Sequence, residues 1–352
     1  MTQRFRADAK DGVRKCWSNM LVRATIHRRA AHILAVLAVA AGAMLAVSQA
    51  TPAAAATNQF KGVNWADTRD NYNTGWVIPD GLAASDTYSQ VYSIANNYIK
   101  AFQSNLGANT VRLPINPPSV SQSWWSAYKG AVDAALADGM NVILCAWTES
   151  SSVGTITSMS AWDSMWATVV NQYGGNGNVY FEPLNEPFGY SASAWISIAS
   201  GWLSMFPSVP RSRVIISGTG YDDNVTAVGA SSALSGTLLA LHIYDTWASY
   251  TTESAWVSNL DGRLGSYMSR TIIDEYGGPM TTGIDYLTDH NNGLAQSYFA
   301  AVTDTARSNS MGTVVWAGLK TGDSYSMEYH NGSGLANNNS SAVTQVRWGW
   351  GY

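Results

Sequence analysis

From residue 57 onward, short apolar runs alternate with longer segments in which apolar residues recur every three or four positions. Short apolar runs are typical of buried strands, and the longer spacing is typical of amphipathic helices. We predict strands at residues 60–65, 109–115, 141–147, 179–185, 213–217, 237–243, 270–275 and 312–319. Helices are predicted between them at residues 87–106, 124–138, 160–173, 191–206, 252–268 and 294–308, with a weaker helical pattern at 221–234.

Near-continuous apolar strands separated by helices predict a parallel sheet that is covered by helices on both faces. Eight such repeats favour an α/β fold of the closed kind, a single (β/α)8 barrel, over an open sheet. An open doubly wound sheet would usually carry a glycine-rich phosphate-binding turn after its first strand. Here that turn reads Asn64-Trp65-Ala66-Asp67 and has no such pattern.

No linker, repeat or block of charge interrupts residues 57–352, so we expect this stretch to form one catalytic barrel domain. The Asn-, Gly- and Ser-rich segment 330–341 predicts an exposed loop. The tail that carries Trp348 and Trp350 either docks on the barrel or forms a surface patch.

The first 56 residues have a different character. Residues 1–30 hold eight basic side chains, residues 33–47 are apolar, and residues 53–56 are all alanine. This order is typical of a secretory signal peptide, whereas a membrane anchor needs about 20 apolar residues. We therefore expect a signal peptide cleaved near Ala56, a secreted protein and no stable membrane anchor. The pair Arg28-Arg29 leaves export by the general or the twin-arginine route open.

The rest of the chain is acidic. Residues 57–352 contain 12 basic and 22 acidic residues, a net charge of -10. Such a surface does not concentrate phosphate polyanions, so we expect no nucleic-acid partner. With 46% hydrophobic and only 12% charged residues, the chain can form a large core, which excludes a disordered or coiled-coil protein. We expect a monomer.

The sequence gives little sign of redox or metal chemistry. Cleavage near Ala56 would remove Cys16 and leave Cys145, which lies in an apolar run and is expected to be a buried, inert thiol. The adjacent Asp222 and Asp223 could bind calcium, but such pairs more often start a helix. The histidines after residue 56 show no paired ligand spacing; they are His242, His290 and His330. We expect no metal and no cofactor.

Polar and aromatic residues lie at the ends of several predicted strands, where (β/α)8 barrels carry their function. They are Trp65, Arg112, Trp147, Asn185, Glu186, His242, Tyr244, Glu275 and Trp316. One carboxylate at a strand end is often a helix cap or half of an ion pair. Two at equivalent strand ends suit hydrolysis of a glycosidic bond, in which one carboxyl donates a proton and the other is ionised.

The segments around these residues resemble glycoside hydrolase family 5, from the clan of retaining (β/α)8 glycosidases. Residues 181–187 read Phe-Glu-Pro-Leu-Asn-Glu-Pro and are similar to the family's fourth-strand motif. Residues 272–277 resemble its seventh-strand nucleophile segment, and shorter segments around Arg112, His242 and Trp316 resemble its second, sixth and eighth strands. The resemblance covers nearly all of residues 60–320 in the family's order.

The resemblance implies a retaining hydrolase that cleaves β-glycosidic bonds of a poly- or oligosaccharide, with Glu186 as general acid/base and Glu275 as nucleophile. The surroundings of each residue agree. Arg112 and the Tyr244 hydroxyl would keep Glu275 ionised. Apolar and neutral neighbours would raise the pKa of Glu186, as a proton donor requires.

Other residues are expected to bind the sugar. Asn185 is placed to bond the 2-hydroxyl of the sugar, and His242 to orient Glu186 or bind a hydroxyl, unless it serves structure only. Trp316 is expected to form a floor for the sugar ring, and Trp65 to add aromatic surface near the site. Glu182 is expected to pair with an arginine inside the barrel, without a catalytic role.

The third strand departs from the family pattern. The family usually has a histidine at its end, but residues 143–149 contain none. Either Trp147 replaces that contact with an apolar wall, or Glu149 supplies a new polar one and competes weakly for a catalytic role. Both alter the first sugar subsite. We therefore expect a neutral glycan with an atypical sugar or linkage there, with β-1,4-glucan and mannan as the default alternatives.

Two further functions stay open. A non-catalytic sugar-binding barrel would keep the aromatic cleft without turnover, although the presence of both carboxylates disfavours it. An inverting hydrolase on the same scaffold would differ in the distance between Glu186 and Glu275, which the sequence does not supply.

Overall fold

The computed structural model describes residues 58–352 except 71–72 and 149–153, so the predicted signal peptide and Glu149 lie outside the described residues. Each predicted strand is found, and each begins within two residues of its predicted start. The barrel strands are β1 (Lys61–Trp65), β2 (Thr110–Ile115), β3 (Asn141–Ala146), β4 (Val179–Glu182), β5 (Ile215–Ser217), β6 (Leu238–His242), β7 (Thr271–Glu275) and β8 (Gly312–Leu319).

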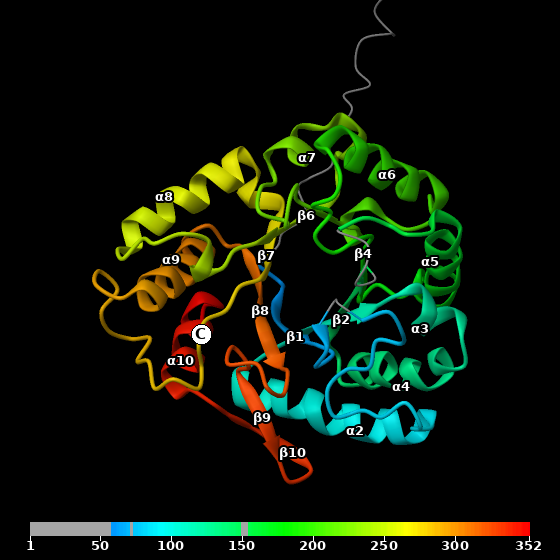
Figure 1. Cartoon of the computed structure of the whole chain (residues 1–352), viewed down its shortest axis with the longest axis horizontal. Coiled ribbons are helices and arrows are strands. Elements are labelled where there is room, and N and C mark those ends of the chain that lie inside the picture. The colour runs from blue at the N-terminus through cyan, green and yellow to red at the C-terminus, as the bar shows by residue number, and fades with distance from the viewer. Residues whose placement is uncertain (1–57, 71–72, 149–153) are drawn as a thin grey trace, which may run out of the picture. The chain divides into compact units, whose positions relative to one another are not determined.

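The strands form a ring of parallel neighbours in the order β4-β3-β2-β1-β8-β7-β6-β5. A parallel bridge between Phe181 and Val214 joins β4 to β5 and closes the ring. Helices surround the strands on the outside (Figure 1). This arrangement confirms the predicted (β/α)8 barrel.

Within the described residues, helices are found in each predicted helical segment, and two more α-helices, at residues 117–121 and 340–349, were not predicted. They are α2 (Tyr88–Ala101), α3 (Pro117–Ser121), α4 (Trp124–Ala137), α5 (Met159–Tyr173), α6 (Ala192–Met205), α7 (Thr226–Ala230), α8 (Glu253–Leu264), α9 (Leu294–Ser308) and α10 (Ser340–Gly349). A π-helical turn at Phe102–Leu106 extends α2, and short 3-10 helices lie at Arg211–Arg213, Ser232–Leu234, Asp245–Trp247 and Gly265–Arg270. The segment with the weakest pattern gives the five-residue α7.

Local sequence fixes where several helices begin. The Thr87 hydroxyl accepts a hydrogen bond from the Gln90 N–H, and the Gln90 side chain accepts one from the Thr87 N–H, which is a capping box. Ser158 and Ser191 cap α5 and α6 through their hydroxyls. Each cap satisfies a backbone N–H that would otherwise lack a partner.

The segment predicted as an exposed loop at 330–341 is instead a hairpin of β9 (Glu328–Asn331) and β10 (Gly334–Asn337), so that prediction is wrong. Gly332 has φ = 63°, and with Ser333 it forms a two-residue turn. Such turns match the twist of paired strands, and glycine adopts this φ without steric cost. The segment is rich in Asn, Gly and Ser, so Gly332 was interpreted as part of a loop and not as the turn of a hairpin.

The C-terminal tail docks on the barrel. Trp350 is buried, and its Nε1 donates to Thr313 Oγ1 of β8 at 2.8 Å. Trp348 is 46% exposed, and the Arg307 guanidinium of α9 lies 3.7 Å from its ring centre. Of the two arrangements left open by the sequence, docking on the barrel therefore holds for Trp350. Within the described residues, no helix is long and apolar enough to cross a membrane.

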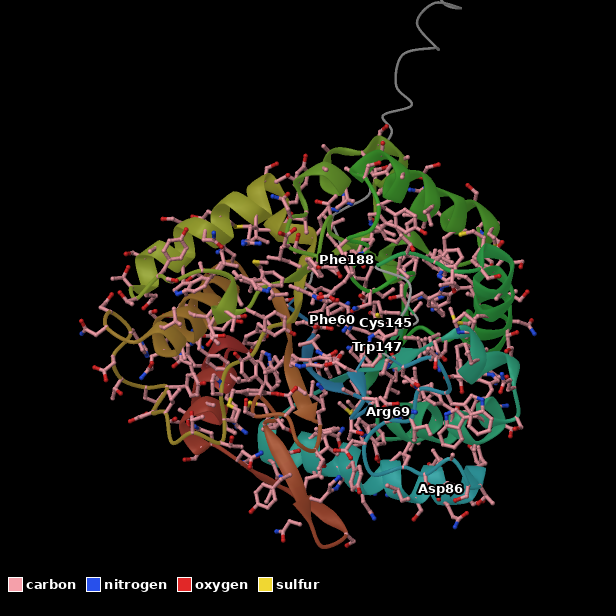
Figure 2. All side chains as sticks on the ribbon, viewed as in Figure 1. Phe60, Arg69, Asp86, Cys145, Trp147 and Phe188 are labelled. Atoms are coloured by element: carbon pink, nitrogen blue, oxygen red, sulfur yellow. The ribbon has the colours of Figure 1, made fainter. Side chains whose placement is uncertain are left out.

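The barrel interior is layered. Its apolar base consists of Phe60, Ile143, Tyr180, Ile215, Leu238, Ala240, Ile272 and Val314. Because side chains alternate along a strand, residues two positions further along face the same interior. These positions include Cys145, Glu182, His242 and Asp274, and Arg112 of β2 joins them; all five are buried. In the view of Figure 2, Phe60 and Cys145 fall inside the ring of strands, while Asp86 lies out by α2. A rigid apolar base thus supports a polar layer at the carboxyl ends of the strands.

Candidate active site

Arg112 of β2 is the hub of the polar layer, and only 1% of its surface is exposed. Its Nε and Nη2 donate to both oxygens of Glu182, at 2.7 and 2.6 Å. Its Nη1 donates to Glu275 Oε1 at 2.5 Å, and its Nη2 to Asn185 Oδ1 at 2.7 Å. Glu182 therefore pairs with an arginine inside the barrel, as predicted. The rigid guanidinium also ties the ends of β4 and β7 together.

Glu275 is held in its ionised form. Besides the bond from Arg112, its Oε2 accepts the Tyr244 hydroxyl at 2.7 Å and lies 3.5 Å from His242 Nδ1. Burial alone would raise the pKa of this carboxyl. The charges of His242 and Arg112 and the two donated hydrogen bonds outweigh burial and lower it below the ordinary 4.5.

Glu186 follows β4 in a tight turn and has the opposite electrostatics. Its backbone adopts φ = 48°, and its N–H donates to Asp222 Oδ2 at 3.1 Å. Its Oε1 lies 3.1 Å from His242 Nδ1. Burial raises the pKa of Glu186 above 4.5, with Glu275 adding to the rise and His242 opposing it.

His242 lies between the two glutamates and is fully buried. Burial lowers the pKa of the imidazole, but the surrounding carboxylates, with Glu275 and Asp222 foremost, raise it to about 10. At neutral pH the ring is therefore a cation that donates from Nδ1 toward the two glutamates. One oxygen of Glu186 and one of Glu275 each lie within 4.8 Å of the other and of His242.

A small pocket opens above these carboxylates. It encloses about 200 Å³ and is lined by Asp70, Trp147, Asn185, Glu186, Tyr244, Glu275 and Trp316. The indole rings of Trp147 and Trp316 lie 6.1 Å apart, tilted by 44°. The volume is below the roughly 300–1,000 Å³ of pockets that hold drug-sized ligands, so the pocket suits one sugar ring.

Most of the predicted site residues meet in this place. Arg112, Asn185, Glu186, His242, Tyr244, Glu275, Trp147 and Trp316 all lie in or directly beneath the pocket. Asn185 Oδ1 is occupied by Arg112, which fixes the amide so that its Nδ2 is the group presented to a ligand. Glu149 lies outside the described residues.

Trp65 is a correction. It is fully buried and packs edge-on against Tyr98 and Phe102 of the α2 segment, with its Nε1 donating to the Asp80 carbonyl at 2.8 Å. Its side chain therefore belongs to the layer between strand and helix, and the expected substrate contact is wrong. Strand alternation explains this, because Asn64 occupies the inward position and bonds to Arg112.

Three acidic residues of the site were missed or misread. Asp70 lines the pocket and forms an ion pair with Lys320 at 2.7 Å. Asp274 is buried beside Arg112 and His242, at 3.7 and 3.6 Å. Asp222 neither starts a helix nor faces solvent. Alternation with the inward Ile272 was an available signal for Asp274, whereas Asp70 lies five residues beyond the end of β1, where no such signal applies.

Cys145 and two groups of possible cation ligands lie in the same polar layer. Cys145 is buried, its Sγ lies 3.1 Å from Arg112 Nη2, and burial raises the pKa of the thiol, which fits the expected inert role. Among the described residues, two sets have side-chain atoms close enough to approach one cation: Glu182 with Asp222 and His242, and Glu186 with His242 and Glu275. In the first set, Arg112 already occupies both Glu182 oxygens.

Comparison with known proteins decides the family. The family model described as Cellulase (glycosyl hydrolase family 5) matches residues 61–320. The chain belongs to glycosyl hydrolase family 5. The matched stretch contains all eight barrel strands as well as Glu186 and Glu275. As a family 5 member, the protein is a glycoside hydrolase.

A curated relative is the manganese-dependent endoglucanase Eg5A of Phanerodontia chrysosporium. It is 29% identical over 172 residues, which are 44% of this chain and 42% of the relative. This chain thus aligns with less than half of the relative's length.

Solved structures share the fold at low identity. Cel5A (EG2) from Hypocrea jecorina is 17% identical with a TM-score of 0.59, covering 82% of this chain and 97% of that one. An endocellulase from Pyrococcus horikoshii, solved with cellotetraose, is 14% identical with a TM-score of 0.60, covering 82% and 91%. The endo-beta-1,4-glucanase Xac0029 from Xanthomonas axonopodis pv. citri is 17% identical with a TM-score of 0.55, covering 82% and 98%. These likenesses support the family's barrel fold.

Proposed function

We propose that this protein is a retaining glycosidase that cleaves a poly- or oligosaccharide by double displacement, with Glu275 as nucleophile and Glu186 as acid/base. One observation carries the proposal. Two carboxyls face the same pocket, and their surroundings shift their pKa values in opposite directions. A protonated and an ionised carboxyl side by side are what this reaction needs.

In the first step, an ionised Glu275 oxygen attacks the anomeric carbon. Glu186 gives its proton to the glycosidic oxygen as the carbon–oxygen bond breaks, and the leaving sugar departs with a hydroxyl. The product is an ester between the sugar and Glu275. Arg112 and Tyr244 bind the Glu275 oxygens and so aim the carboxylate at the carbon.

In the second step, Glu186, now ionised, takes a proton from water, and the water oxygen attacks the anomeric carbon. The ester bond breaks, Glu275 is released as a carboxylate, and the sugar leaves with its original anomeric configuration. Asn185 supports both steps if its Nδ2 donates to the 2-hydroxyl, a bond that strengthens in the transition state.

The distance between the carboxyls favours retention over inversion. Retaining enzymes keep their two carboxyl groups about 5–5.5 Å apart, and inverting enzymes about 6.5–9.5 Å apart. Here one oxygen of Glu186 and one of Glu275 lie within 4.8 Å of each other, which is closer than the separation typical of inverting enzymes.

Two variants test the roles. Glu275→Gln should lose turnover of every substrate, since no glycosyl ester can form. Glu186→Ala should still be glycosylated by a dinitrophenyl glycoside, whose leaving group departs without a proton, and added azide should restore its deglycosylation. Glu149→Gln, which removes the competing carboxylate, should keep normal turnover.

Reversed behaviour of the first two variants would exchange the roles. Loss of activity in Glu149→Gln with retained activity in either of the others would reject the assignment. Sugar binding by the wild-type protein with no turnover of any glycan would instead favour the non-catalytic barrel.

For the substrate, we propose a neutral glycan with an atypical sugar or linkage at the first subsite. Trp147 forms an apolar wall of the pocket where the family usually has an imidazole. An indole has no accepting nitrogen, and an unpaired buried hydroxyl costs about 1–3 kcal/mol. A sugar that presents that hydroxyl differently avoids this cost.

Trp147→His tests the substrate proposal. It should raise kcat/KM on β-1,4-glucan oligosaccharides relative to the best natural substrate by about tenfold, since 1.4 kcal/mol corresponds to that factor. Trp147→Phe, which restores no acceptor, is the control and should not. High wild-type activity on carboxymethyl-cellulose or glucomannan, with weak activity on other glycans, would contradict the proposed substrate. It would not affect the proposal that the protein is a retaining glycosidase.

We also propose that the protein is secreted, on the basic, apolar and small-residue order of residues 1–56. Expression of the full chain should release enzyme that begins near residue 57 into the medium, as read by N-terminal sequencing. A chain found uncleaved inside the cell would contradict this.

A further inference from the structure

Asp222 lies in the loop after β5, is fully buried and connects three strand ends. Its Oδ2 accepts the backbone N–H of Glu186 at 3.1 Å, beyond β4. The same oxygen lies 3.5 Å from His242 Nε2 on β6, and its backbone carbonyl accepts the His242 N–H at 2.9 Å. Asp222 thus contacts Glu186 directly and also the imidazole that faces the Glu186 carboxyl.

Both partners of the Asp222–Glu186 hydrogen bond have left-handed backbones. Glu186 has φ = 48° and Asp222 has φ = 58°. Residues with side chains rarely adopt this region, and they keep it where surrounding contacts enforce it. The hydrogen bond joins the two turns, so each turn helps to hold the other in place.

A ring pair braces the same two loops. Phe188, two residues after Glu186, stacks on Tyr221, with ring centres 4.2 Å apart and planes 19° apart. Gly154 packs against Phe188, where a Cβ would lie 2.5 Å from the ring. The turn that carries Glu186 is therefore fixed at its backbone and at its neighbouring side chain.

We propose that Asp222 is the positioning residue of the acid/base: it fixes the backbone turn of Glu186 and the orientation of His242, and so aims the Glu186 carboxyl at the glycosidic oxygen. The inference rests on the proposed role of Glu186 as acid/base. Asp222 itself does not line the pocket, so it acts through these two neighbours.

The contact requires an accepting oxygen at this position. Burial raises the pKa of Asp222 well above its ordinary value, and Oδ2 accepts the Glu186 N–H whether or not Oδ1 carries a proton. An asparagine can therefore reproduce the contact, and it also tolerates φ = 58°. Glycine adopts that φ with the least strain but removes the acceptor.

Asp223 provides a matched control. It is the next residue along the chain, but its side chain is 42% exposed and faces Arg263 at 3.6 Å. It makes no contact with Glu186 or His242 among the described residues. Asp223→Ala therefore removes a carboxylate from the same loop without touching the acid/base.

The test compares two glycosides of the same sugar, chosen as the β-glycoside that the wild-type enzyme hydrolyses fastest. The phenyl glycoside needs a proton from the acid, and the 2,4-dinitrophenyl glycoside does not. The readout is kcat/KM for the dinitrophenyl substrate divided by kcat/KM for the phenyl substrate. Misplaced acid catalysis raises this ratio, whereas a general loss of folded enzyme lowers both values equally.

Asp222→Gly should raise the ratio at least about tenfold, since a positioned general acid contributes about 10²–10⁴-fold to rate. Asp222→Asn should stay within about threefold of wild type, and Asp223→Ala should leave the ratio unchanged. If Asp222→Gly does not fold, Asp222→Ser replaces it in the test. The serine side chain is one bond shorter than that of aspartate, so its hydroxyl does not reach the Glu186 N–H.

An equal loss on both substrates, or no loss, in Asp222→Gly would overturn the proposal. So would a ratio in Asp222→Asn as high as in Asp222→Gly, because the effect would then come from charge rather than from the accepting oxygen. Glu186→Ala, measured beside them, separates the two claims. If it fails to raise the ratio, the role of Glu186 is wrong; if it raises the ratio and Asp222→Gly does not, only the role of Asp222 is wrong.

Discussion

At the scale of single residues, the surroundings of Glu186 and Glu275 give two chemically identical side chains different pKa values. Glu275 accepts hydrogen bonds from Arg112 and Tyr244, both of which favour its charge. Among the described residues, no arginine is bonded to Glu186, and burial at the edge of the pocket favours its neutral form. The proposed roles of Glu186 as acid and Glu275 as nucleophile rest on the neighbours of each carboxyl.

These opposite shifts predict a bell-shaped pH dependence of kcat/KM. Activity should fall as pH drops through the pKa of Glu275, which lies below 4.5, because the nucleophile becomes protonated. It should also fall as pH rises through the pKa of Glu186, which lies above 4.5, because the acid loses its proton. Rates on the phenyl glycoside from about pH 3 to pH 9 would measure both limbs.

The matched experiment uses Glu186→Gln with the dinitrophenyl glycoside, which needs no acid. Its alkaline limb should disappear while the acid limb remains. An alkaline limb that persists at an unchanged midpoint would assign it to another group, with His242 the first to examine.

The sequence led us to propose Glu186 and Glu275 as the reacting pair because both follow apolar strand patterns and lie in recognisable segments. It did not predict the residues that hold them. Asp222 looked like a helix start or a calcium ligand, since no pattern along the chain shows that its loop turns inward at φ = 58°. Its role depends on contacts with residues 36 and 20 positions away, which only the fold brings together.

At the scale of elements, a register shift shapes the site. Leu241 pairs with Ile273, but His242 pairs with Glu275, so β7 carries one extra residue at this point. Strict alternation would turn either Asp274 or Glu275 away from the interior. The irregularity lets both lie beside His242. Sequence periodicity predicts regular strands and cannot locate such a shift.

A glycine after β7 permits the close approach of β8. A Cβ on Gly277 would lie 1.9 Å from the Trp316 backbone oxygen, far inside normal contact. Gly277→Ala should therefore displace Trp316, a wall of the pocket, and lower the free energy of unfolding by about 1–3 kcal/mol or more. Thermal melting and kcat/KM should both fall.

Gly201→Ala is the control, because Gly201 lies on α6 and an added Cβ meets nothing within 4 Å. It should keep activity and raise stability by up to about 1 kcal/mol, since alanine favours the helix. Equal melting temperatures and activities in both variants would contradict the close-approach argument.

At the scale of the whole molecule, several buried groups hold protons more tightly in the folded chain than in the unfolded one. The pKa values of Glu186, Asp222, His242, Asp274 and Glu328 are all raised, and that of Glu275 is lowered. Where the folded state binds more protons, stability decreases as pH increases. We therefore expect the highest melting temperature at mildly acidic pH and a fall toward about pH 9.

Glu328 lies outside the active site and contributes one measurable part of the pH dependence of stability. It is buried on β9, its Oε1 accepts from Asn105 at 2.6 Å, and burial raises its pKa from 4.5 to about 7. Its contribution is therefore fully present below about pH 4.5 and is lost as pH rises through 7, on the order of 3 kcal/mol in all. Glu328→Gln should flatten the loss of stability between those pH values.

Denaturant unfolding at several pH values measures this effect. Asp261→Asn, which changes an exposed carboxylate on α8, should follow the wild-type curve. A Glu328→Gln curve as steep as that of the wild type would show that Glu328 ionises without cost in the fold.

The central claim is that Glu275 becomes covalently glycosylated. The most direct measurement is peptide mass spectrometry of Glu186→Ala after mixing with a dinitrophenyl β-glycoside, because this variant should form the ester but hydrolyse it slowly. We predict the mass of one glycosyl residue on the peptide that contains Glu275. An adduct on another residue, or hydrolysis by the wild-type enzyme with inverted configuration and no adduct, would contradict the account.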